Sequence, residues 1–180
     1  MKDLHILVIG LGSMGKRRIR NLLALNITNI SGFDLRNDRR EEASRLYGIK
    51  IFDSFQKATE IKSNAWIIST SPDMHHGYMK EAITHEVPSF IEASVVDTDF
   101  SSIIPDAERN KIFLAPSCTL YFHPAIKTIR EIIKSRKLGR ITNILYHSGQ
   151  YLPDWHSYEN VSDFYVSKKS TGGAREIVPF

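Results

Sequence analysis

Short apolar runs alternate with longer segments of mixed polarity along most of the chain. The short runs are rich in isoleucine, valine and phenylalanine, which is typical of buried strands. In the longer segments apolar residues recur three or four positions apart, which is typical of amphipathic helices. We therefore predict an α/β fold in which βαβ units build a doubly wound parallel sheet with helices on both faces. The predicted strands are "HILVIG", "NISGFD", "KIFDS", "AWIISTS", "PSFIEASVV" and "KIFLAPSCT".

The pattern changes near Gly139. Before this residue "HPAIKTIREIIKS" predicts a helix, and after it "RITNILYHSGQY" alternates as a strand with one exposed face does. We predict a domain boundary near residue 120. Residues 1–120 are expected to form the parallel-sheet domain, and residues 121–180 a bridging helix and the start of an incomplete α+β domain. Exposed edges of such an unfinished sheet invite self-association, so we expect a homo-oligomer.

The composition is that of an ordinary globular protein, with 42% hydrophobic and 24% charged residues. The net charge is +4, but the basic residues lie in separate clusters, which favours solvated helix faces over a nucleic-acid partner. Cys118 is the one cysteine and lies in an apolar stretch, so we expect a buried small residue and a reducing compartment. With no membrane-length apolar run and no signal-peptide pattern, we expect a cytoplasmic protein without a membrane partner.

Three glycines follow the first apolar run: Gly10, Gly12 and Gly15 give the pattern G-x-G-x-x-G. The pattern follows a predicted strand, opens a predicted helix, and precedes by about 20 residues Asp34 at the end of the next strand. The first glycine permits a tight turn, the second lets the backbone approach a pyrophosphate, and the third lets the helix pack close to the strand. The combination predicts a Rossmann-type dinucleotide-binding domain in residues 1–120.

The predicted cofactor is NAD, held by the glycine turn, by Ser13 and Met14 at the helix N-terminus, and by Asp34. The Asp34 carboxylate accepts hydrogen bonds from ribose hydroxyls and repels a 2′-phosphate, which favours NAD over NADP. Arg36 and Arg39 weaken this preference, because an arginine near this strand end pairs with a 2′-phosphate.

Further segments make the chain resemble the glucose–fructose oxidoreductase / inositol dehydrogenase / rhizopine-catabolism (Gfo/Idh/MocA) family. The resemblance runs through the whole chain and rests on the order and spacing of its motifs taken together. These motifs are "VIGLGSMGKRRIRNL", "STSPDMHHGYMKEAI", "VPSFIEAS", "YFHPAIKTIREIIKSRKLGRI" and "GGARE". The resemblance implies an NAD-dependent oxidoreductase that acts on a sugar, a sugar nucleotide or a polyol.

In this family the segment after the fourth strand lines the nicotinamide side of the cleft. Thr70, Ser71, Pro72 and His75 fall on the family's T-x-P-x-x-H positions, with His76 as the alternative if the register shifts by one residue. The resemblance implies that these four residues contact the cofactor and that His75 is also a candidate catalytic residue.

The chain departs from the family at two positions where proton chemistry is expected. The family's fifth strand usually ends with Glu-Lys-Pro, whereas this chain has Glu92, Ala93 and Ser94. Glu92 matches, and it is a candidate for contact with the nicotinamide ribose or the substrate, but alanine cannot take the lysine's role. The family's catalytic histidine follows a Gly-Gly turn, and here the register places Phe180 near that position. Phenylalanine cannot move a proton.

Two further catalytic candidates lie in the second half of the chain. Tyr121 matches the start of the family's inter-domain helix, where an arginine or tyrosine often faces the cleft. The stretch "YLPDWHSYE" is dense in groups suited to sugars and contains His156; an aromatic loop packed on a sheet is the alternative interpretation. His147, Asp154 and His156 lack the spacing of a recognised metal site, so no metal is predicted.

The sequence thus favours an NAD(H)-dependent oxidoreductase with a small sugar-like substrate. The rival hypothesis is a non-catalytic dinucleotide-binding module, or an inactive fragment, that keeps the cofactor site and lacks the usual lysine and histidine. Family members run to about twice this length, which fits either a fragment of a longer enzyme or a stand-alone domain.

Overall fold

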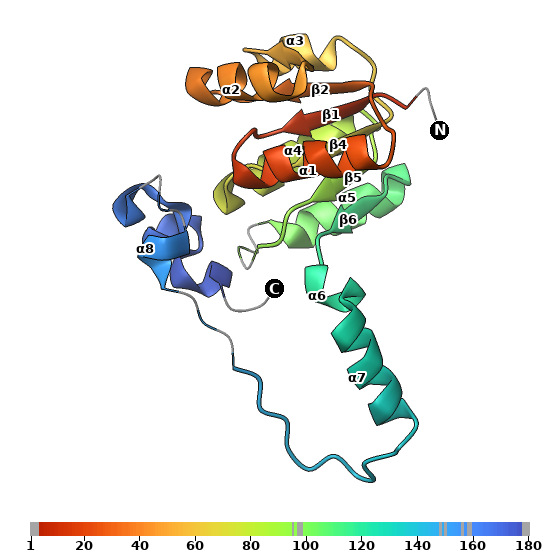
Figure 1. The fold of residues 1–180 in the computed structure, drawn as a ribbon. Coiled ribbons are helices and arrows are strands. Elements are labelled where there is room, and N and C mark those ends of the chain that lie inside the picture. Colours follow the sequence, from red (N-terminus) through yellow and green to blue (C-terminus); the bar gives the residue numbers. More distant parts are fainter. Residues whose placement is uncertain are drawn as a thin grey trace. The chain divides into compact units, whose positions relative to one another are not determined.

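A computed structural model of the protein describes residues 4–94, 96, 99–147, 149, 151–155, 157 and 160–177 (Figure 1). The chain divides into two compact units, Met1–Ser117 and Cys118–Phe180. Across the residues that the structure describes, no helix is long and apolar enough to cross a lipid bilayer.

The first unit is built on a six-stranded sheet with the strand order β3-β2-β1-β4-β5-β6 (Figure 1). All five strand pairings are parallel, and the register sets Ile6 of β1 opposite Ile30 of β2 and Ala65 of β4. The predicted doubly wound parallel sheet is therefore confirmed. The strands are β1 (Ile6–Ile9), β2 (Ile30–Phe33), β3 (Lys50–Phe52), β4 (Ala65–Ile68), β5 (Ser89–Ile91) and β6 (Leu114–Pro116).

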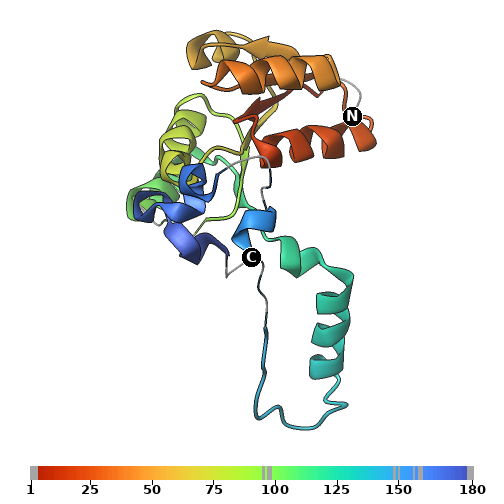
Figure 2. The same ribbon diagram turned by 60° about the vertical axis from the view of Figure 1, so that its left-hand side comes forward.

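Helices cover both faces of this sheet (Figure 2). Successive side chains of a strand point to opposite faces. In β1, Ile6 and Val8 therefore join a core with α1 and α2, while Leu7 and Ile9 join a core with α3, α4 and α5. The helices of this unit are α1 (Ser13–Ala24), α2 (Asn37–Tyr47), α3 (Phe55–Thr59), α4 (His75–Thr84) and α5 (Phe100–Asn110), with a 3₁₀ turn η1 (Pro72–Met74) before α4.

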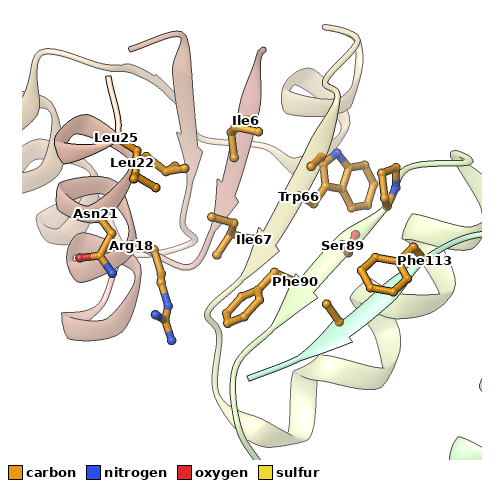
Figure 3. Close-up of a pocket in the computed structure, with 13 residues that line it drawn as sticks. Ile6, Arg18, Asn21, Leu22, Leu25, Trp66, Ile67, Ser89, Phe90 and Phe113 are labelled. Atoms are coloured by element: carbon orange, nitrogen blue, oxygen red, sulfur yellow. The ribbon is translucent and has the colours of Figure 1, made fainter. Parts of the chain in front are cut away.

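An apolar hollow of about 380 Å³ lies beside α1 on one face of the sheet (Figure 3). Its wall is lined by residues of α1 and of the strands β1, β4, β5 and β6, together with Leu25, Pro88 and Phe113. Arg18 of α1 brings a charged group to this wall, and its guanidinium carbon lies 4.8 Å from the centre of the Phe90 ring. Asn21 and Ser89 also line the hollow, and its other lining residues are apolar.

The parallel topology determines where a ligand site can form. The carboxyl ends of all six strands meet at one edge of the sheet, and β1 lies between β2 and β4 in the strand order. The chain turns to opposite sides after β1 and before β4, and ligands of open α/β sheets bind at such a switch point. The glycine turn and the segments after β2, β4 and β5 all lie at this edge.

The second unit consists of short helical elements and loops in the part that is described. Its helices are α6 (Thr119–Phe122), α7 (Pro124–Lys134) and α8 (Leu152–Trp155), and its 3₁₀ turns are η2 (Val161–Asp163), η3 (Tyr165–Ser167), η4 (Lys169–Thr171) and η5 (Gly173–Ile177). The predicted helix before Gly139 is thus present as α7.

Two expectations for the second half of the sequence were wrong. Residues 141–147 are irregular and mostly exposed rather than a strand. A strand needs a neighbour for its backbone N–H and C=O groups, and the described part of the second unit supplies none. Cys118 is exposed rather than buried, because β6 ends at Pro116 and Ser117 is the last buried residue before the chain leaves the first unit.

Candidate functional site

The glycine turn between β1 and α1 contains two glycines that the fold itself requires. Gly10 has a φ of +89°, and a Cβ atom there would lie 2.6 Å from the carbonyl oxygen of Ser69. A Cβ atom at Gly15 would overlap the carbonyl oxygen of Gly10. Gly10 therefore makes the turn possible, and Gly15 lets α1 pack directly on the turn.

Gly12 plays a different part in the turn. Its φ of −68° is accessible to any residue, and a Cβ atom there would meet the guanidinium of Arg39 at 3.4 Å as its nearest neighbour. Gly12 caps α1, so the backbone N–H groups of Ser13 and Met14 belong to the first helical turn, where no intrahelical carbonyl is available to them. The space at Gly12 and these N–H groups together suit an anionic group such as a pyrophosphate.

Asp34, directly after β2, is tied to the glycine turn. The backbone N–H of Leu11 donates to its Oδ2 at 2.7 Å, and that of Arg36 donates to its Oδ1 at 2.8 Å. Asp34 is only 7% exposed, and Nη1 of Arg39 lies 3.7 Å from its Oδ2. The structure thus brings together the Asp34 carboxylate and the glycine turn.

The negative charge of Asp34 also affects the pKa of Tyr78 in α4. Burial, and to a smaller extent the negative charges of Asp34 and Glu81, raise the pKa of Tyr78 above its usual value. The Tyr78 phenol therefore stays neutral across the physiological pH range.

The segment after β4 buries several polar groups at the same edge of the sheet. Pro72 begins η1 and His75 begins α4. His75 is 4% exposed, and its Nε2 lies 3.1 Å from the backbone carbonyl oxygen of Thr70. Burial lowers the pKa of His75, against the opposing effects of that carbonyl and of the nearby carboxylates Glu92 and Asp73. His75 is therefore a neutral imidazole near pH 7.

Two polar atoms in this segment remain unsatisfied. Oγ1 of Thr70 and Oδ1 of Asp73 are buried, and neither finds a hydrogen-bond partner within the described part of the chain. Buried polar atoms without a partner are rare in native proteins, and a bound water or ion is one explanation for them. Together with the first-turn N–H groups of α1, they fit a bound dinucleotide at this edge.

Glu92, directly after β5, is held by an ion pair that the sequence analysis missed. Nε and Nη2 of Arg18 donate to the two carboxylate oxygens of Glu92 at 2.5 and 2.8 Å, and Ser69 Oγ donates to Oε1 at 3.3 Å. Arg18 and Glu92 are 74 residues apart in the sequence. The parallel topology could have predicted this pair, because it places the first turns of α1 and the end of β5 at the same edge of the sheet.

The remaining predicted site residues lie in other surroundings. The guanidinium of Arg36 bonds to the exposed Asp38 at 3.1 and 2.6 Å. Tyr121, in the second unit, is 54% exposed, and the Arg130 guanidinium lies 5.0 Å from the centre of its ring. His156 lies outside the described residues, as do Tyr158 and Phe180. Where the chain is described, no group of three or more His, Cys, Asp or Glu residues is placed to hold a metal ion.

Fold and site together define a dinucleotide-binding Rossmann domain. The model of the family GFO_IDH_MocA, described as an oxidoreductase family with an NAD-binding Rossmann fold, matches residues 4–97. Because this match covers more than half of the sequence, the chain belongs to that family. The resemblance inferred from the motifs is thereby confirmed. A comparison with curated proteins gave no match.

Several solved structures share the fold. Myo-inositol 2-dehydrogenase from Lactobacillus plantarum gives a TM-score of 0.71 at 16% identity, covering 78% of this chain and 43% of that one. The WlbA dehydrogenase from Bordetella pertussis, in complex with NADH and UDP-GlcNAcA, gives 0.70 at 13% identity, with 78% and 43% covered. GenD2 from gentamicin A biosynthesis, in complex with NAD, gives 0.69 at 15% identity, with 76% and 40% covered. The chain thus spans about two fifths of the length of these proteins.

The lowered pKa of His75 predicts a loss of stability in mild acid. Below about pH 6.5 the unfolded chain takes up a proton on this residue that the folded chain resists, so the free energy of unfolding falls as the pH falls. We expect the urea midpoint to drop less between pH 7.5 and pH 5 in His75→Gln than in the wild type. The partly exposed neighbour provides the control, since His76→Gln should keep the wild-type pH dependence. Equal pH dependence in His75→Gln and the wild type would contradict this assignment.

The Arg18–Glu92 pair predicts a coupled loss of stability. Arg18→Met leaves the Glu92 carboxylate buried without its cation, and we expect it to cost about 2 kcal/mol in urea unfolding at pH 7. Adding Glu92→Gln should recover much of that loss, because the neutral amide tolerates burial better. Arg17→Met, at an exposed position of the same helix, serves as the control and should change stability by less than about 0.5 kcal/mol. Additive single and double variants would show that the two side chains are not coupled.

Proposed function

We propose that this chain binds NAD(H) and serves an oxidoreduction at a carbinol or carbonyl carbon of a sugar, a sugar nucleotide or a polyol. The observation that carries the proposal is the glycine turn hydrogen-bonded to Asp34 at the N-terminus of α1. NAD supplies the hydride acceptor, and NADH the donor, when bound. The chain supplies position, electrostatics and a proton acceptor.

Each part of the site has a proposed task toward the cofactor. The N–H groups of Ser13 and Met14 hold the pyrophosphate, and Gly12 leaves the room that it needs. Asp34 accepts hydrogen bonds from ribose hydroxyls. The buried Oγ1 of Thr70, which has no hydrogen-bond partner in the described structure, forms a hydrogen bond to the cofactor. The other members of the proposed cofactor site, at the end of β4 and β5, are Ser71, Pro72, His75 and Glu92.

His75 is the proposed proton acceptor. Its Nε2 faces the carbonyl oxygen of Thr70, and because a carbonyl oxygen only accepts, Nε2 carries the proton. In the neutral ring Nδ1 is then unprotonated, and it is the nitrogen that can accept a proton. Glu92 is paired with Arg18 and is proposed to orient the cofactor or substrate. Tyr121 and His156 are further candidates for proton transfer.

The substrate class rests on relatives and on composition. The WlbA structure contains UDP-GlcNAcA, and another structural neighbour is an inositol dehydrogenase. The segment "YLPDWHSYE" adds aromatic and hydroxyl-binding groups of the kind that recognise sugars. These observations support a polyhydroxylated substrate.

A second candidate function is a dinucleotide-binding module without catalysis. It is favoured by the end of β5, where Ala93 stands in place of the family's usual lysine and both carboxylate oxygens of Glu92 are engaged by Arg18. In that case His75 would serve only the structure. Turnover separates the two functions, and cofactor binding does not.

The first test is a titration with NADH followed by nicotinamide fluorescence. We expect saturable binding by the wild type and at least about tenfold weaker binding by Gly12→Ala, because the added methyl group enters the space proposed for the pyrophosphate. The fold should tolerate this change, since the Cβ atom meets only the flexible end of Arg39.

The control for this titration is Gly77→Ala in α4. Gly77 is exposed, and a Cβ atom there would meet nothing within 4 Å, so this variant should bind NADH as the wild type does. The proposal fails if the wild type does not bind NADH, or if Gly12→Ala binds it with unchanged affinity while remaining folded.

The second test is a turnover screen with NAD and a panel of sugars, uridine diphosphate sugars, inositols and simple non-sugar alcohols. We expect reduction of NAD with a polyhydroxylated substrate, and a fall in kcat of about 100-fold or more in His75→Gln, measured at saturating NAD because His75 is also proposed to contact the cofactor. Turnover confined to non-sugar alcohols would overturn the substrate class. Tight NADH binding without any turnover would favour the non-catalytic module.

A further inference from the structure

The Arg18 side chain reaches from α1 to the carboxyl end of β5. Its guanidinium donates two parallel hydrogen bonds to Glu92, from Nε to Oε1 at 2.5 Å and from Nη2 to Oε2 at 2.8 Å. Nη2 also donates to Oγ of Ser117, just after β6, at 3.3 Å. The guanidinium lies beside the Phe90 ring, with its carbon 4.8 Å from the ring centre (Figure 3). Arg18 is thus held by contacts to three residues, and it presents its planar fork to one carboxylate.

Glu92 lies at the end of β5 with little of its side chain open to solvent. The side chain of Glu92 is 9% exposed and that of Arg18 is 18% exposed. Burial of an unpaired carboxylate is costly, and pairing with an arginine through two hydrogen bonds offsets that cost while it also sets the plane of the carboxylate. The residues that follow Glu92, Ala93 and Ser94, carry no charge, so the cation that pairs with Glu92 comes from α1.

Glu92 keeps one acceptor position for a ligand. A carboxylate has about four acceptor positions, two on each oxygen. Within the described part of the chain, Arg18 and Ser69 occupy two positions on Oε1, and Arg18 occupies one on Oε2. The second position on Oε2 is therefore available to a ligand hydroxyl, in an orientation that the Arg18 fork fixes.

We propose that Arg18 is a positioning residue of the cofactor site: its two hydrogen bonds hold Glu92 so that Oε2 accepts a hydrogen bond from the nicotinamide-side ribose of the dinucleotide. The inference rests on the proposed function, in which Glu92 orients the cofactor or substrate. It deepens that function by giving Arg18 an indirect role, through Glu92. Without the fork, the carboxylate would have to be ordered when the ligand binds, and that ordering would lower the affinity.

The test titrates NADH and ADP separately by calorimetry. ADP has the adenosine ribose and the pyrophosphate but lacks the nicotinamide-side ribose, so its binding does not depend on Glu92. We expect Arg18→Met to weaken NADH binding at least about tenfold and ADP binding less than about threefold, as the loss of a hydrogen bond to a charged group predicts. Arg17→Met removes the same charge at the next, exposed position and should leave the ratio of the two dissociation constants unchanged.

Glu92→Gln tests whether Arg18 acts through Glu92. We expect it to raise the ratio of the NADH and ADP dissociation constants as much as Arg18→Met does. The double variant should raise the ratio no further, since Arg18 then has no carboxylate to hold. Arg18→Lys keeps a charge beside Glu92 but lacks the planar fork, and it should raise the ratio by at least about threefold. This variant keeps the test decisive if Arg18→Met does not fold.

The outcomes separate this inference from the function on which it rests. Three results would overturn the inference: equal weakening of NADH and ADP by Arg18→Met, an unchanged ratio in a folded Arg18→Lys, or a double variant that recovers the wild-type ratio together with its stability. Each of them leaves NADH binding by the wild type, and with it the proposed function, intact. A wild type that does not bind NADH would overturn the proposed function and this inference together.

Discussion

The hydrogen bond from the Leu11 N–H to the Asp34 carboxylate joins the two halves of the ligand-binding edge. It fixes the glycine turn, which follows β1, to the end of β2, and it orients the carboxylate beside the N-terminus of α1. The second oxygen of Asp34 is fixed by the Arg36 N–H, so the carboxylate cannot rotate freely. The glycine turn and the carboxylate are therefore held in place by the protein's own hydrogen bonds.

At the ends of β4 and β5, the protein's own side chains neutralise the buried charge. Glu92 is paired with Arg18, and His75 is kept neutral by burial. The two groups lie close enough for the Glu92 charge to act on the pKa of His75. Removing Arg18 would therefore also affect His75, through the charge of the Glu92 carboxylate. Arg18 also reaches the apolar hollow beside α1, so one side chain links that hollow to the end of β5.

Much of the first unit could be predicted from the sequence, because its central strands β1 and β2 are buried throughout and its helices carry apolar residues on the side that faces the sheet. The glycine turn and Asp34 could be singled out because each belongs to a short local sequence pattern. The Arg18–Glu92 pair was not found, since it depends on strand order rather than on sequence neighbours. The alternation of apolar and polar residues wrongly predicted a strand at residues 141–147, where no partner strand is described. The separate partners of Arg36 and Arg39 depend on side-chain geometry that no spacing encodes.

The contrast between Gly15 and Gly12 has an evolutionary consequence. Gly15 is constrained by the carbonyl of Gly10 whether or not a ligand binds, so descendants that abandon the cofactor must still keep it. Gly12 is under no such restraint from the fold. Among homologues, the middle glycine is therefore the position whose retention reports selection for nucleotide binding, while the outer two report only selection for folding.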